Sequence, residues 1–143
     1  MAGGAPSRKT DRMGASMGQE RKPKILLVDD SSTVLIMEEM LLRSKYDVVK
    51  ATGGAQALRI AAEQKPDLVL LDIVMPAMDG LETCRLLRAM EATRSTPIIM
   101  VTTRGERKTM DAATAAGANG YVTKPIDQKE LLSKVDQYLG AKP

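Results

Sequence analysis

Four short apolar runs of this sequence end at residues whose side chains suit phosphoryl chemistry. ILLV is followed by Asp29 and Asp30, LVLL by Asp72, IIMV by Thr102, and YVT by Lys124. Carboxylates bind hard metal ions, whereas a hydroxyl and an ammonium donate hydrogen bonds to phosphoryl oxygens. Because ligands of a parallel α/β sheet bind where the carboxyl ends of its strands meet, we expect these five residues to form one site.

The three carboxylates indicate what kind of site this is. Asp29, Asp30 and Asp72 would repel one another unless a cation lay between them. Their ligand atoms are all oxygens and the chain contains no histidine, so Mg²⁺ or Mn²⁺ fits better than zinc. Lys124 and Thr102 then suit the remaining oxygens of a phosphoryl group, and Asp72, which stands alone, is the candidate nucleophile.

The segments between these residues alternate between apolar runs and helical spacing, which predicts a doubly wound α/β fold. We expect a parallel sheet of five strands with helices on both faces. Strands are predicted at 24–30, 47–51, 67–71, 97–102 and 119–123, and helices at 55–64, about 80–90, 106–116 and 127–139. A further helix, capped by Ser31 or Ser32, is expected to bury its apolar residues, which are Val34, Leu35, Met37, Leu41 and Leu42.

Size and composition limit the class of protein. The chain has 143 residues, which suffices for one domain with its own core. Cys84 is the single cysteine, which predicts a buried thiol and a cytoplasmic location. The stripe of Leu86, Leu87 and Met90 is also predicted to be core. No stretch resembles a secretory signal or a transmembrane helix, so membrane insertion is not expected.

The excess positive charge lies near the N-terminus. Residues 1–24 carry six basic and two acidic side chains, whereas the other 119 residues carry 15 basic and 16 acidic ones. We therefore interpret residues 1–23 as a flexible basic tail, 24–140 as the folded domain and 141–143 as the C-terminal end. Because the folded part is not basic, direct DNA binding is not expected.

Taken together, the motifs ILLVDDS, LVLLDIVMPAMDG, IIMVT and GANGYVTKP resemble the receiver domain of two-component response regulators. The resemblance covers residues 24–140 and is to the stand-alone, single-domain type that includes the chemotaxis response regulator. It implies a flavodoxin-like (βα)5 fold. It also implies a phosphorylated signalling protein rather than an enzyme with an external substrate.

The resemblance assigns a role to each residue of the predicted site. Asp72 matches the phosphoacceptor. Asp29 and Asp30 match the acidic pair that binds Mg²⁺ together with Asp72 and the backbone carbonyl of Val74. Thr102 matches the switch hydroxyl.

Two residues near the end of the domain also match the family pattern. Lys124 matches the lysine that pairs with the phosphoryl group, and its bond to Pro125 matches one that is usually cis. Tyr121 matches the aromatic residue that rotates on activation.

The implied reaction is a Mg²⁺-dependent transfer of a phosphoryl group to Asp72 from the phosphohistidine of a histidine kinase or a phosphotransfer protein. The face formed by the fourth helix, fifth strand and fifth helix would then change and control a downstream target protein, in a chemotaxis or motility pathway or another one. The chain ends just after the fifth helix, so we expect no DNA-binding or enzymatic output domain. A monomer or a phosphorylation-dependent dimer is expected.

Two alternatives stay open at this point, and a third is disfavoured. The chain could be a phosphorelay intermediate that passes its phosphoryl group to a phosphotransfer protein, or a pseudo-receiver that acts as a constitutive scaffold. A haloacid-dehalogenase-like phosphatase is disfavoured, because that family needs an aspartate two positions after the first, where this chain has Ser31.

Three residues beside the predicted site depart from the family pattern. Val74 stands where chemotaxis-type regulators carry asparagine, and Arg104 lies two positions after the switch threonine. Both positions border the path of the hydrolytic water in this family, so we expect self-dephosphorylation to be slower than in chemotaxis regulators. Thr103 is larger than the usual alanine or glycine and is predicted to restrict small phosphodonors.

Overall fold

The computed structural model describes residues 21–103 and 107–140, in which strands and helices alternate along the chain. The strands are β1 (Lys24–Val28), β2 (Asp47–Ala51), β3 (Leu68–Asp72), β4 (Ile98–Thr102) and β5 (Gly120–Thr123). The helices are α1 (Ser32–Leu42), α2 (Gly54–Gln64), α3 (Gly80–Ala89), α4 (Arg107–Ala116) and α5 (Gln128–Leu139), with a 3-10 turn, η1, at Glu91–Thr93.

All five strands form one parallel sheet in the order β2-β1-β3-β4-β5. The chain moves outward from β1 to β2 and then crosses to the other side of β1, where β3, β4 and β5 follow. This is the order of flavodoxin-like folds, in which the reversal creates a crevice between the first and third strands. The predicted fold class is confirmed.

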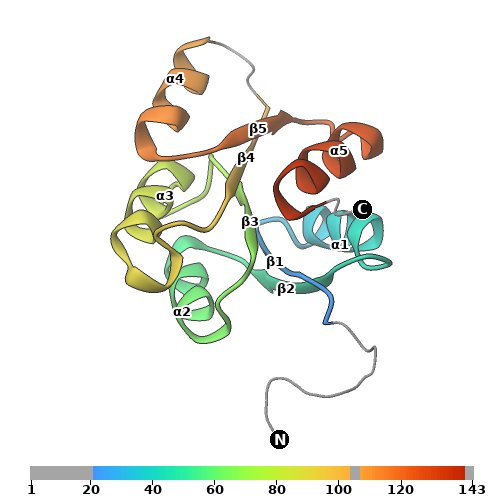
Figure 1. Cartoon of the computed structure of the whole chain (residues 1–143). Coiled ribbons are helices and arrows are strands. Elements are labelled where there is room, and N and C mark those ends of the chain that lie inside the picture. Colours follow the sequence, from blue (N-terminus) through green and yellow to red (C-terminus); the bar gives the residue numbers. More distant parts are fainter. Residues whose placement is uncertain (1–20, 104–106, 141–143) are drawn as a thin grey trace, which may run out of the picture.

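Helices cover both faces of the sheet, as Figure 1 shows: α2, α3 and α4 lie on one face and α1 and α5 on the other. Each face has its own apolar core. The first joins Leu26, Leu71 and Met100 to helix residues such as Ala57 and Leu87. The second core lies under α1 and α5.

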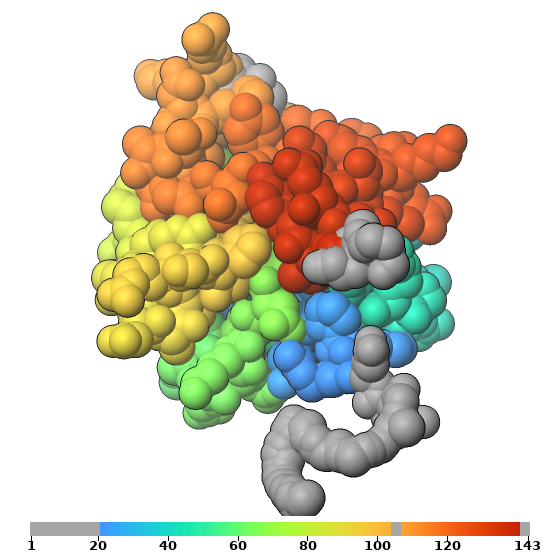
Figure 2. All heavy atoms as spheres, viewed as in Figure 1, coloured from blue at the N-terminus to red at the C-terminus, as the bar shows by residue number. Residues whose placement is uncertain are grey.

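In the space-filling view, side chains fill the gaps between the ribbons, and α4 stands out at the top (Figure 2).

The second core lies between the sheet and the helices α1 and α5. The strands contribute Leu27, Val101 and Val122, and the helices contribute residues such as Leu35 and Leu131. Strand residues of both cores are almost fully buried, as expected for a sheet covered on its two faces.

Two apolar residues that we predicted to be buried are exposed instead. Met37 of α1 is 39% exposed and Leu86 of α3 is 37% exposed. The buried stripe of α1 runs through Leu35, Glu38 and Leu42, so Met37 lies on its flank and a glutamate takes the inner position. Leu86 lies beside the buried stripe of α3 in the same way, whereas Cys84 is fully buried as predicted.

The first strand is shorter than predicted, because it ends at Val28 rather than at position 30. Asp29 turns the chain there, since its Oδ1 accepts a hydrogen bond from the backbone N–H of Ser31 at 2.9 Å. Ser31 then caps α1 by accepting from the N–H of Val34. The acidic pair therefore lies just beyond β1, in the loop at the carboxyl edge of the sheet.

Most of the predicted N-terminal tail, residues 1–20, lies outside the described residues. Arg21 and Lys22 are described and contact the domain through Asp67 Oδ2 and the backbone carbonyl of Arg43. No helix within 21–103 and 107–140 has the length and apolar character needed to span a membrane.

Candidate functional site

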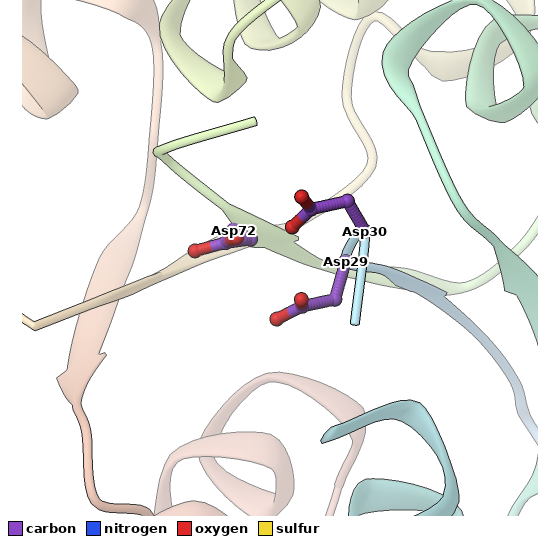
Figure 3. Close-up of side chains that lie close together, drawn as sticks. All are labelled: Asp29, Asp30 and Asp72. Atoms are coloured by element: carbon purple, nitrogen blue, oxygen red, sulfur yellow. The ribbon is translucent and has the colours of Figure 1, made fainter. Parts of the chain in front are cut away.

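The predicted site residues after β1 and β3 come together at the carboxyl edge of the sheet. Asp72 is the last residue of β3, and Asp29 and Asp30 follow β1, the strand beside it. One carboxylate oxygen from each of the three residues lies within 4.8 Å of the others. Figure 3 shows the three side chains converging from these two strand ends. The cluster lies where the strand order reverses, as the fold requires of a ligand site.

The two inner carboxylates are held in an environment that disfavours two negative charges. Asp29 is 1% exposed and Asp72 is 5% exposed, whereas Asp30 faces solvent. Burial, followed by the negative charge of Asp29, raises the pKa of Asp72 to about 6, against the opposing effect of Lys124. A cation at this cluster would relieve that repulsion.

Lys124 supplies the positive charge of the site from the loop after β5. Its Nζ lies 3.1 Å from Asp29 Oδ2 and 3.4 Å from Asp72 Oδ1. Burial alone lowers the pKa of Lys124, but the hydrogen bonds and charges of the two carboxylates outweigh it and leave the pKa above its usual value. The bond between Lys124 and Pro125 is cis, as the resemblance implies.

Thr102 and Tyr121 lie on the neighbouring strands β4 and β5. Thr102 ends β4, is 3% exposed, and accepts a hydrogen bond from the backbone N–H of Lys124 through its carbonyl at 2.8 Å. Tyr121 is half-buried and packs against the apolar core between the sheet and the helices α2, α3 and α4. It also lines an open pocket of about 360 Å³ with Arg107, Met110 and Asp111 of α4. The switching roles of both residues stay predictions.

The loop from β3 to α3 fixes the backbone of Asp72. A Cβ atom at Gly80 would lie 2.1 Å from the carbonyl oxygen of Asp72, so only glycine permits this approach. The N–H of Gly80 donates to the carbonyl of Ile73 at 2.7 Å, and Asp79 caps α3 by accepting from the N–H of Glu82. The Asp79-Gly80 pair of the motif therefore fixes the start of α3 against the backbone of Asp72, the candidate phosphoacceptor.

Of the residues that depart from the family pattern, the structure describes two. The Val74 side chain is 72% exposed beside the cluster, and Thr103 is also exposed. Whether the Val74 carbonyl is a metal ligand stays a prediction. Arg104 lies outside the described residues.

The sequence interpretation missed one residue of the site, Glu38 of α1. Its side chain is 1% exposed, and burial, followed by the charge of Asp29, raises its pKa to about 8. The signal was present in the sequence: Glu38 lies three residues after Leu35 and four before Leu42, on the apolar stripe.

The donor set of the acidic cluster fits Mg²⁺. Three carboxylates at the ends of two adjacent strands offer oxygen ligands only, and the chain has no histidine that would favour a softer metal. The exposed Asp30 leaves one side of the cluster open, which suits an ion that keeps several of its waters.

Comparison with known proteins points to one family. The chain is 37% identical to protein PilH of Pseudomonas aeruginosa over 117 residues, covering 81% of this chain and 97% of PilH. It is 39% identical to the transcriptional regulatory protein PhoP of Bacillus subtilis over 117 residues, covering 81% of this chain but 48% of PhoP. The chain thus spans nearly all of one relative and about half of the other.

Solved structures agree with these relatives. Chemotaxis protein CheY4 of Vibrio cholerae is 31% identical with a TM-score of 0.79, covering 82% of this chain and 98% of that one. The receiver domain of sensor histidine kinase PA1611 of Pseudomonas aeruginosa, solved with a magnesium ion in its active-site cleft, is 34% identical with a TM-score of 0.78, covering 84% and 99%. The model of the response regulator receiver domain matches residues 25–136. The chain therefore belongs to the response regulator receiver domain family.

Proposed function

We propose that this chain works as a single-domain response regulator that is phosphorylated on Asp72. The observation that carries the proposal is the oxygen-only cluster of Asp29, Asp30 and Asp72 at the strand reversal, with the ammonium of Lys124 beside it. The near-complete coverage of PilH supports the single-domain type.

Asp29, Asp30 and Asp72, with the carbonyl of Val74, would hold Mg²⁺, which supplies positive charge for the oxygens of the incoming phosphoryl group. A carboxylate oxygen of Asp72 attacks the phosphorus of a phosphohistidine, forming a P–O bond as the P–N bond breaks. The electron pair of the broken bond returns to the imidazole nitrogen of the donor, which takes up a proton from solvent. Lys124 pairs with one phosphoryl oxygen, and the Thr102 hydroxyl donates to another.

The output would pass from Thr102 to the face formed by α4, β5 and α5. Thr102 pairs in register with Thr123 of β5, and Tyr121 on the same strand lines the pocket against α4. Movement of Thr102 toward a phosphoryl group on Asp72 would leave room for Tyr121 to turn inward. That change would alter the pocket that a target protein contacts.

The partners follow from this chemistry. A histidine kinase or a phosphotransfer protein supplies the phosphoryl group, and a downstream protein binds the changed face, with the chain acting as a monomer or a phosphorylation-dependent dimer. CheY4 is described as a chemotaxis protein, which favours a chemotaxis or motility pathway for this chain as well. A cytoplasmic location without direct DNA binding completes the proposal.

The proposal is tested by labelling with a phosphorylated phosphotransfer protein and, separately, with phosphoramidate. Intact-mass measurement should show a gain of one phosphoryl group with Mg²⁺ and none with EDTA. Asp72→Asn should abolish the gain. Asp111→Asn is the matched control, because its side chain is 74% exposed on α4 and away from the cluster. Labelling of Asp72→Asn, or labelling that is independent of the metal, would contradict the proposal.

A further inference from the structure

Glu38 is a buried carboxyl group on the inner face of α1. It lies on the same stripe as Leu35 and Leu42, which pack against the sheet, and it is 1% exposed. Its Oε1 has no hydrogen-bond partner among the described residues. A buried polar atom without a partner costs about 1–3 kcal/mol, so its presence calls for an explanation.

The charges that act on Glu38 are those of the candidate site. Asp29 and Asp72 raise its pKa and Lys124 lowers it, so the charges of the cluster act on this buried carboxyl group. With a pKa of about 8, Glu38 is mostly neutral at pH 7. A neutral carboxyl group still offers an acceptor oxygen.

Only one of these three neighbours can donate a hydrogen bond to that oxygen. Ionised Asp29 and Asp72 are acceptors, whereas the ammonium of Lys124 has three N–H donors. Two of the three are directed at Asp29 Oδ2 and Asp72 Oδ1.

Both oxygens of Asp29 are already in use without a metal. Oδ1 accepts from the N–H of Ser31 at 2.9 Å, and Oδ2 accepts from Lys124 at 3.1 Å. A divalent cation that binds Asp29 therefore competes with Lys124 for Oδ2. The ammonium then loses one of its two partners, and because Lys124 is partly buried, replacing that partner with another acceptor is favourable.

We propose that Glu38 is a positioning residue whose Oε1 receives the Lys124 ammonium when a divalent cation takes Asp29 Oδ2. The exchange gives Lys124 a neutral acceptor in place of a carboxylate and gives the buried oxygen the partner it lacks. Glu38 thereby strengthens Mg²⁺ binding without touching the metal. The inference rests on the Mg²⁺ site of the proposed function.

The test compares Glu38→Gln, which keeps an acceptor oxygen, with Glu38→Leu, which removes it. We expect calorimetric titration with Mg²⁺ to show an affinity within about twofold of the unmodified protein for Glu38→Gln. For Glu38→Leu we expect affinity about tenfold lower, the equivalent of one hydrogen bond to a charged group. The matched control is Glu39→Leu, because Glu39 is the same residue type one position away but pairs with Lys50 at 2.7 Å.

A second measurement follows Lys124 itself. On addition of Mg²⁺, the 15Nζ chemical shift of Lys124 should change to the same final value in the unmodified protein and in Glu38→Gln. In Glu38→Leu the final chemical shift should differ from that value. The same final position in Glu38→Leu would overturn the proposal. Backbone NMR spectra of each variant establish that the fold is intact.

The remaining outcomes separate the inference from the proposed function. If the unmodified protein binds no Mg²⁺, the proposed function fails and the inference fails with it. If it binds Mg²⁺ and Glu38→Leu binds equally well, only the inference is overturned. Equal weakening in Glu38→Gln and Glu38→Leu would also overturn it, because the effect would then come from the charge of Glu38 rather than from an acceptor.

Discussion

The two edges of the sheet hold their cationic side chains in opposite ways. At the amino edge, Arg88 of α3 donates to neutral oxygens: Nε to the carbonyl of Gly117 at 2.9 Å, Nη1 to that of Thr96 at 2.7 Å, and Nη2 to Asn119 Oδ1 at 2.7 Å. At the carboxyl edge, Lys124 donates to two carboxylates.

The difference lies in what can compete for the partners. Carbonyl and amide oxygens of Gly117, Thr96 and Asn119 have no stronger ligand nearby, and Asn119 Oδ1 also accepts from the N–H of Ile98 at the start of β4. Arg88 therefore ties α3 to the segments that lead into β4 and β5. The carboxylates beside Lys124 suit a divalent cation, so under the proposed function the Lys124 pairing would be exchanged when the ion binds. We call the first the fixed edge and the second the exchangeable edge.

The largest effect is expected at the fixed edge. Arg88→Ala should lower the free energy of unfolding by about 3 kcal/mol, because several carbonyl groups lose their donor at once. Urea denaturation measures the loss, and labelling of Asp72 in the folded protein should persist. Loss of labelling with unchanged stability would break the comparison.

A second prediction concerns the pH dependence of stability at the exchangeable edge. Burial raises the pKa of Glu38 to about 8, so between about pH 5 and pH 8 the folded protein holds a proton that the unfolded chain releases. Stability should therefore fall as pH rises, and Glu38→Gln should lack this contribution. The charged groups that face Glu38, which are Asp29, Asp72 and Lys124, are the same in both proteins.

Urea denaturation at pH 5.5 and 7.5 measures this difference. Relative to the unmodified protein, Glu38→Gln should gain about 2 kcal/mol between those two pH values, since one pKa unit corresponds to about 1.4 kcal/mol and titration is incomplete at both ends. An equal pH dependence of the two proteins would show that Glu38 is ionised in the folded state.

The smallest predicted effect is the stabilisation by Mg²⁺. At ten times its dissociation constant, the ion should raise the free energy of unfolding by about 1.4 kcal/mol. The increment should be the same in Arg88→Ala and strongly reduced in Asp29→Asn. A reduced increment in Arg88→Ala would mean that the two edges are coupled.

That these residues lie close together could be predicted from the sequence, because their positions are fixed by strand ends. Asp72 and Thr102 end buried apolar runs, and Asp29 follows one, so the parallel sheet alone brings them to one edge. The role of Arg88 could not be predicted, since most of its acceptors are backbone carbonyls of irregular segments, and no sequence pattern marks these.

The helices show where reasoning from the sequence failed. We placed Met37 in the core because it is apolar, although the stripe through Leu35 and Leu42 passes through Glu38. A charged residue on a helix is normally assumed to face solvent. The charges that act on Glu38 belong to Asp29, Asp72 and Lys124, which are far from it in the sequence or on other elements, and helical spacing does not reveal them.

The contact between Gly80 and the carbonyl of Asp72 sets a direction for any signal that begins at Asp72. A carbon atom added at Gly80 would overlap the backbone of Asp72, so α3 packs directly against the end of β3, and a Cβ at Gly54 of α2 would lie 2.4 Å from Thr83 Oγ1 of α3. We therefore expect the α2–α3 half to move least when Asp72 is phosphorylated. A structural response to phosphorylation is expected to travel the other way, through β4 and β5 to α4.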